Sequence, residues 1–139
     1  MRGASALQAV LDRVPGEELS VLVVWEPVIA SDLGPPTESV RNLLSDPRTV
    51  HFWDEDRLLS KTLVHEWTAS GIRIESGDRR NPDVTIWDFV AVFPRGAHWN
   101  GTLPEASHYG SPVVEQVEEV RAKLFEAMRG ERASPSPGS

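Results

Sequence analysis

The stretch VLVVWEPVIASDLGPPTESV, residues 21–40, decides the fold. An apolar, β-branched run over 19–25 is typical of a central strand that is covered on both faces. Pro27 ends this strand, because proline has no N–H to donate to a sheet. The double proline that follows, with Thr37 and Glu38 after it, indicates the start of a helix. The stretch therefore predicts a strand, a loop and a helix in that order.

The same patterns continue in both directions along the chain. Apolar residues at helical spacing predict helices over 4–14, 37–45, 54–70 and 111–129. Apolar runs predict further strands over 49–53, 84–93 and about 97–101, and 72–76 fits either a short strand or a loop. A crossover helix makes the first two strands parallel, and a tight turn makes the last two antiparallel. The expected fold is α/β, with a mixed central sheet and helices on both faces.

The length of 139 residues fits one domain with a sizeable core. Residues 1–130 contain all the predicted elements and form that domain. Residues 131–139 lack apolar anchors, and we expect them to be a disordered tail.

Composition excludes several classes of function. The net charge of −7 disfavours binding to nucleic acid or to an anionic membrane. The chain has no cysteine, which excludes disulfides, thiolate metal sites and dithiol chemistry of its own. It has no secretory signal and no apolar run long enough to cross a membrane, so we expect a cytoplasmic protein. No motif indicates a cofactor.

The order and lengths of these elements, over residues 4–129, resemble the thioredoxin-like fold, a three-layer α/β/α sandwich. VLVVWEP (21–27) is similar to the family's apolar strand that ends in Trp before the Cys-x-x-Cys loop, and VAVFPRGAHW (90–99) resembles its late hairpin. By that placement, residues 29–32 stand where the two cysteines and their spacers would be. The Trp-x-Pro loop and the Phe-Trp-Asp motif also resemble a group of uncharacterised bacterial thioredoxin-like proteins. The missing cysteines and the lack of a clear counterpart to the family's cis-proline are departures from the pattern.

The loop edge after the first strand carries the candidate site. Tryptophans end the first two strands, and parallel pairing would bring them to one edge of the sheet, where open α/β folds bind ligands. The candidate binding residues are Trp25, Glu26, Pro27, Ser31, Asp32, Trp53 and Asp54. In a structural interpretation, the carboxylates and the hydroxyl only cap turns, and the indoles only pack in the core.

A metal site is a further hypothesis for the segment HFWDEDR, 51–57. The possible ligands are His51, Asp54, Glu55 and Asp56, with His65 and Glu66 on the next helix. Neighbouring strand residues point to opposite sides, however, and an acidic first helical turn explains the carboxylates without a ligand. We predict no bound metal.

Two functions remain. The first, which we prefer, is a non-redox binding or interaction protein whose contact surface lies at the 26–36 edge, with an unknown protein partner or a second copy of itself. The alternative is a small carboxylate- or metal-dependent enzyme that uses Glu26, Asp32 and Asp54. Convergence of these carboxylates, with a raised pKa, would favour the enzyme.

Overall fold

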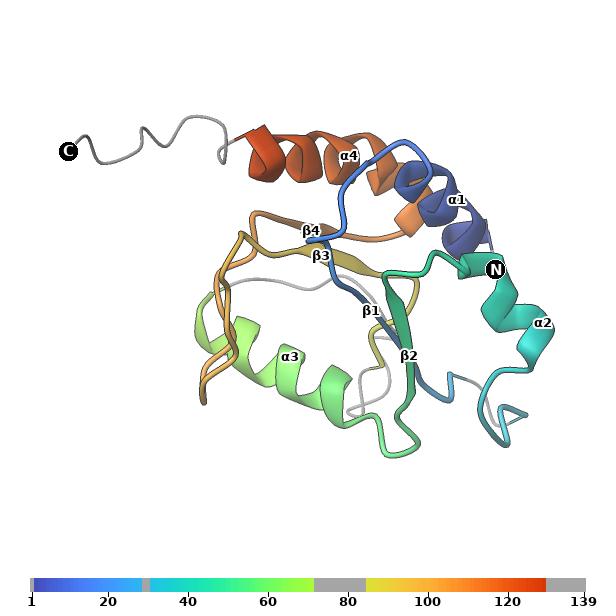
Figure 1. Ribbon diagram of the computed structural model, residues 1–139. Helices are drawn as coiled ribbons and strands as arrows, with labels where there is room; N and C mark the ends of the chain where they lie inside the picture. The colour runs from blue at the N-terminus through green and yellow to red at the C-terminus, as the bar shows by residue number, and fades with distance from the viewer. Residues whose placement is uncertain (1, 29–30, 72–84, 130–139) are drawn as a thin grey trace.

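The structure is a computed structural model that describes residues 2–28, 31–71 and 85–129 (Figure 1). In chain order its elements are α1 (Arg2–Leu11), β1 (Val21–Trp25), α2 (Glu38–Arg41), the 3-10 helix η1 (Asn42–Leu44), β2 (Thr49–Trp53), α3 (Leu58–Ala69), β3 (Val90–Val92), β4 (His108–Gly110) and α4 (Val113–Arg129). They form a mixed α/β structure with two sheets of two strands each. The predicted segment 72–76 and the tail 131–139 lie outside the described residues.

The parallel pairing of the first two strands is confirmed. β1 and β2 pair from Val21 opposite Thr49 to Trp25 opposite Trp53. The connection between them contains α2 and η1, a crossover of the kind that parallel strands require. The two tryptophans therefore end their strands side by side at one edge.

The solvent exposure of one face of the β1–β2 pair differs from the prediction. The strand at 19–25 was expected to be covered on both sides, but Leu22 is 66% exposed. Val50, its register partner, and Phe52 are also exposed. A continuous apolar run therefore did not reveal how many faces of the strand are covered.

The predicted strand at 84–93 is wrong over most of its described length. Only Val90–Val92 is a strand, because Asp88 has a left-handed backbone with φ 50. Upstream of it, the N–H of Ile86 bonds to the hydroxyl of Ser60 at 2.9 Å and not to a neighbouring strand. A side chain on another element has replaced the sheet partner.

The predicted fourth strand at 97–101 is also wrong. The expected turn does form, since Ala97 N donates to Pro94 O at 3.1 Å, but the chain after it stays irregular. The antiparallel partner of β3 is β4, with Ala91 opposite Tyr109. A longer connection therefore replaces the tight hairpin.

Helices contact both sides of β4. Successive strand residues point to opposite faces. His108 Nε2 bonds to Gln116 of α4 at 2.9 Å, and the ring of Tyr109 packs on Trp67 of α3, with 5.1 Å between ring centroids. Figure 1 shows α4 and α3 on opposite sides of the β3–β4 pair. The core next to α4 consists of Val10, Val14, Val92, Val120 and Leu124.

The two long terminal helices agree with the sequence pattern, whereas α3 begins later than expected. α4 follows a cis Ser111–Pro112 peptide bond. The helix predicted to start at Asp54 begins at Leu58, but the Asp54 carboxylate still accepts an N–H of its first turn, from Leu59 at 2.8 Å. No helix within the described ranges is both long and apolar enough to span a membrane.

Candidate functional site

The carboxyl edge of the β1–β2 pair brings two acidic residues together. Glu26 and Asp54 directly follow the paired residues Trp25 and Trp53. The N–H of Asp54 donates to the carbonyl of Trp25 at 2.8 Å, which continues the parallel ladder by one bond. The strand register therefore sets the two carboxylates at the same edge.

Ser60 holds the Glu26 carboxylate in place. Glu26 Oε1 accepts the backbone N–H of Ser60 at 3.1 Å, and Oε2 accepts its hydroxyl at 2.5 Å. Ser60 lies in the first turn of α3 and is only 2% exposed. Its hydroxyl oxygen also accepts the N–H of Ile86, so one side chain joins β1, α3 and the segment before β3.

The environment of Glu26 perturbs the ionisation of its carboxyl group. Burial raises the pKa of this carboxyl above its usual 4.5, and the charge and hydrogen bonding of Asp54 raise it further. The two hydrogen bonds from Ser60 work in the opposite direction but do not cancel the effect. Two neighbouring carboxyl groups of this kind can divide the roles of proton donor and proton acceptor.

Asp32 closes a turn of its own loop, which is the structural interpretation of this residue. It is exposed, and its Oδ2 accepts the N–H of Val28 at 2.8 Å, so that this oxygen closes a turn of its own loop. Ser31 is exposed and Pro27 is half-buried. The structure thus brings together Glu26 and Asp54, but not the third carboxylate of the predicted set.

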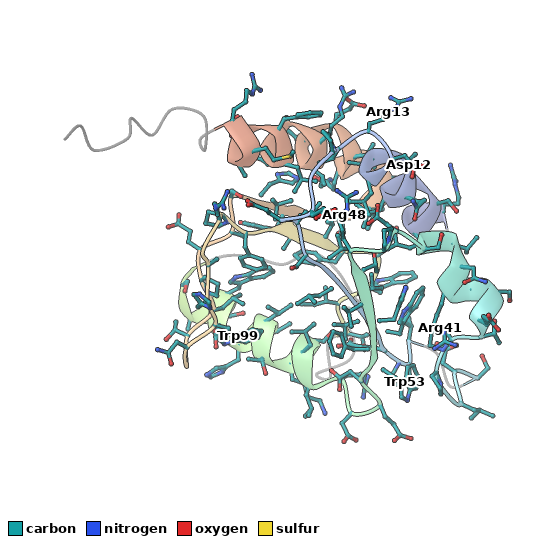
Figure 2. The ribbon with its side chains drawn as sticks, viewed as in Figure 1. Asp12, Arg13, Arg41, Arg48, Trp53 and Trp99 are labelled. Atoms are coloured by element: carbon teal, nitrogen blue, oxygen red, sulfur yellow. The ribbon has the colours of Figure 1, made fainter. Side chains whose placement is uncertain are left out.

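The indole N–H of Trp25 forms a hydrogen bond within the protein. Its indole N–H donates to His51 Nδ1 at 3.0 Å, and the two rings stack with 6.0 Å between centroids. An indole N–H can only donate, so Nδ1 accepts and Nε2 carries the hydrogen given to Leu44 O at 3.0 Å. Both ring nitrogens of His51 are therefore occupied, and the half-buried Trp53 is the indole left at the edge (Figure 2).

The predicted metal ligands do not form a cluster. His51 is held by Trp25 and Leu44, whereas Asp54 bonds to the start of α3. Glu66, on α3, accepts the N–H of Leu103 at 2.5 Å. Across the described part of the chain, no group of three or more His, Asp or Glu side chains could hold a metal ion.

A buried ion pair that the sequence did not reveal lies just before the start of β2, at the end of the strand opposite to the carboxyl edge. Arg48 and Asp46 form a two-pronged pair, with 2.8 Å from Nε to Oδ1 and 2.7 Å from Nη2 to Oδ2. The remaining guanidinium hydrogens bond to the carbonyls of Leu11, Val14 and Gly16 at 2.8–2.9 Å. These hydrogen bonds from Arg48 lower the pKa of the Asp46 carboxyl and outweigh the effect of its burial.

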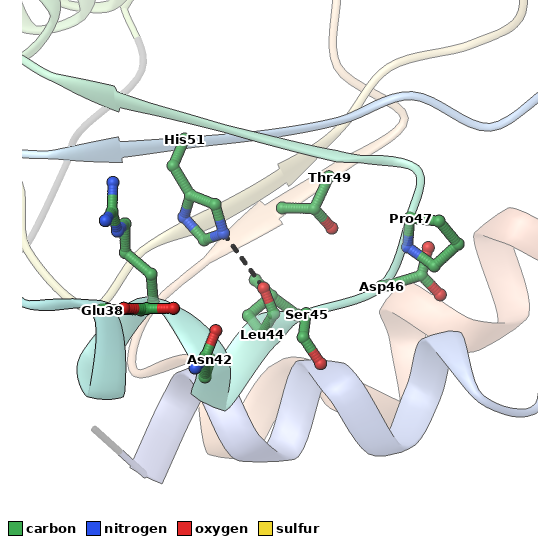
Figure 3. A pocket seen from close by; sticks show the side chains of 9 residues that line it. Glu38, Asn42, Leu44, Ser45, Asp46, Pro47, Thr49 and His51 are labelled. Atoms are coloured by element: carbon green, nitrogen blue, oxygen red, sulfur yellow. Dashed lines mark hydrogen bonds between the residues drawn. The ribbon is translucent and has the colours of Figure 1, made fainter.

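This ion pair supports one end of an open cavity of about 410 Å³ between α2, η1 and β2 (Figure 3). The residues that line it are Glu38, Arg41, Asn42, Leu44, Ser45, Asp46, Pro47, Thr49 and His51. The sequence analysis had singled out His51 for a metal site and had assigned no function to the other residues. No sequence motif predicts this cavity, because the crossover and the strand that form its walls become neighbours only in the folded structure.

No protein-family model, curated protein or solved structure matches this chain. The thioredoxin-like family and its bacterial members therefore stay a prediction. The chemistry of the edge and of the cavity is the basis for assigning a function.

Proposed function

We propose that the chain is a non-redox binding protein on a thioredoxin-like, three-layer α/β/α scaffold. The parallel β1–β2 pair and the antiparallel β3–β4 pair would be the two halves of its mixed central sheet. The contacts of β4 with α4 on one face and with α3 on the other support this layering. The chain has no cysteine, so the scaffold has no thiol chemistry of its own.

The binding surface is the edge that follows β1 and β2, and exposed apolar side chains are the observation that carries this proposal. Leu33, in the loop after β1, is 91% exposed, and Leu58, at the start of α3, is 61% exposed. Val28 is also exposed in the described part of the 26–36 loop. Large apolar side chains on a rigid edge provide contact area for a partner.

A protein partner or a second copy of the chain suits this edge best. The net charge of −7 opposes nucleic acid and anionic lipid, whereas apolar side chains beside carboxylates fit a protein surface that carries basic groups. Trp53 supplies a large, rigid group at the same edge.

Leu33→Ser and Leu58→Ser test this proposal. Both side chains are exposed, so the fold should tolerate the change. Immobilised parent protein is used to capture partners, and sedimentation velocity measures self-association. Leu22→Ser is the matched control, because Leu22 is a comparably exposed leucine that lies on the sheet face and not at the edge. The proposal holds if the edge variants lose a partner or the self-association that the control keeps, and it fails if all three behave like the parent.

A specific observation favours a second candidate, a carboxylate-dependent enzyme at the same edge. Burial and the neighbouring Asp54 raise the pKa of Glu26, which is the direction of shift that a general acid needs. Asp54 would be the partner base, and Ser60 would fix the orientation of Glu26. Asp32, which closes its own loop, has no assigned part in this reaction.

A panel of chromogenic esters and glycosides tests the enzyme candidate. Any turnover by the parent should be lost in Glu26→Gln and in Asp54→Asn, and kept in Asp32→Asn. Activity that survives Glu26→Gln, or no activity on any substrate, would leave the binding protein as the better proposal.

A further inference from the structure

The cavity between α2, η1 and β2 is distinct from the proposed binding edge. His51 and Thr49 on β2 form one wall, and Glu38 and Asn42 on the crossover form the opposite wall (Figure 3). It is an open groove of about 410 Å³, which has room for a small molecule that keeps one side in solvent.

Glu38 and Arg41, two charged residues that line the cavity, are not paired with each other. Glu38 and Arg41 are three residues apart on the crossover, a spacing at which opposite charges usually pair. In α4, Glu118 and Arg121 at the same spacing do form an ion pair, of 2.7 Å. Within the described ranges neither Glu38 nor Arg41 has an ion-pair partner, so both charges are available to a ligand.

Polar side chains also line the cavity. The hydroxyl oxygen of Thr49 is buried and has no hydrogen-bond partner among the described residues, so it offers no accessible group to a ligand. The amide of Asn42 and the hydroxyl of Ser45 line the same space.

Two further lining residues, Asp46 and His51, are held in position by hydrogen bonds within the protein. Asp46 is held by Arg48, and its negative charge is thereby neutralised. His51 is held by its hydrogen bonds to Trp25 and Leu44. The cavity therefore presents one free positive and one free negative group on a rigid base, which lowers the cost of ordering a ligand.

We propose that this cavity binds a small zwitterion of the α-amino-acid class. The guanidinium of Arg41 takes the carboxylate, in the two-pronged geometry that suits this pair, and Glu38 takes the ammonium group. A simple anion would be repelled by Glu38, and a simple cation by Arg41. Asn42, Ser45 and Thr49 line the space that the side chain of the ligand would occupy.

Titration of ¹⁵N-labelled protein with each of the common L-amino acids tests the proposal, with acetate and methylammonium as half-ligands. At least one amino acid should shift the amide signals of residues 38–51 at millimolar concentration, and neither half-ligand should do so. Arg41→Gln and Glu38→Gln should each weaken the binding by about tenfold or more, the loss expected for one charged hydrogen bond. Arg13→Gln is the matched control, since Arg13 is an exposed cation outside the cavity, and it should bind as the parent does.

Three results would overturn the proposal. The first is that no amino acid shifts these signals. The second is that acetate or methylammonium alone shifts them as strongly, because the site would then recognise only a single charge. The third is that Arg13→Gln weakens binding as much as Arg41→Gln, because the effect would then come from overall charge. None of these outcomes bears on the edge formed by Leu33 and Leu58, so the two proposals fail independently.

Discussion

Replacing Arg48 by methionine removes the guanidinium that joins the end of α1 to the segment before β2. Each of its five N–H donors is used, two on Asp46 and three on backbone carbonyls. These carbonyls belong to Leu11, the last residue of α1, and to Val14 and Gly16 just after it, and carbonyl groups at a helix end have no partner within the helix. Methionine retains much of the volume but supplies no donor.

The expected cost is large because the pair is buried. The Arg48 side chain is 14% exposed and that of Asp46 is 8% exposed. Loss of one partner leaves the other charge uncompensated, which costs about 3–5 kcal/mol in buried pairs. A domain is commonly stable by only about 5–15 kcal/mol, so Arg48→Met should remove a large share of the free energy of unfolding.

Urea denaturation followed by tryptophan fluorescence measures the loss. Arg121→Met is the matched control, because the Arg121–Glu118 pair has a similar length of 2.7 Å but lies on the surface of α4. Exposed pairs contribute about 1 kcal/mol or less. In the double variant Asp46→Asn/Arg48→Met no charge is left behind, so it should be less destabilised than the sum of the two single changes. Equal, small losses for Arg48→Met and Arg121→Met would refute the reasoning.

The loss of stability in Arg48→Met should also depend on pH. The pKa of Asp46 is lowered by the hydrogen bonds of Arg48, so the folded state holds this proton less tightly than the unfolded state does. The stabilisation is then complete above the usual value of 3.8 and is lost as the pH falls through the lower, folded value. The difference between parent and Arg48→Met should shrink in that acidic range.

Three further outcomes are expected. The stability of Glu26→Gln relative to the parent should rise as the pH rises above 4.5, because the raised pKa of Glu26 means that its charge opposes folding above that usual value. The amide keeps only one acceptor oxygen for Ser60, a loss that does not depend on pH, so urea melts at several pH values separate the two effects, and a relative stability that falls with rising pH would contradict the prediction. Gly3→Ala should cost about 1 kcal/mol by overpacking, since its Cβ would lie 3.0 Å from Val113 Cβ, whereas the 2.6 Å approach to Asp88 Oδ1 is relieved by rotation of that side chain. Gly34→Ala, with no atom within 4 Å, should be nearly neutral in the same melts, and equal effects would argue against crowding. Insulin reduction with dithiothreitol should not exceed the blank, because the chain has no thiolate, and turnover above the blank would refute this.

The convergence of the candidate carboxylates at the carboxyl edge of the β1–β2 pair was only partly predictable. The parallel pairing of two apolar runs that end in Trp25 and Trp53 was enough to predict that Glu26 and Asp54 meet. For Asp32 the sequence allowed two interpretations, a site carboxylate or a turn cap, and did not decide between them, because a carboxylate close to a backbone N–H in its own loop can close a turn.

In the third predicted strand, tertiary contacts override the local sequence pattern. The apolar run over 84–93 predicted a long strand, but the described part pairs only from Val90 to Val92. The hydroxyl of Ser60 takes the N–H of Ile86, and Asp88 adopts a left-handed backbone. A partner 26 residues away therefore decided a feature that the local pattern had assigned to a sheet.

By itself, the sequence determined the periodic helices at both ends, the parallel order of the first two strands and the absence of thiol chemistry. These properties depend on neighbouring residues or on composition, so they can be recognised without knowing what lies nearby in space. Only the tertiary structure decided that Ser60 holds Glu26 and that Arg48 closes the end of α1. The partners in these contacts are separated by 34 residues for Ser60 and by up to 37 for Arg48. Contacts over such distances depend on where the folded elements meet, and no local spacing encodes that.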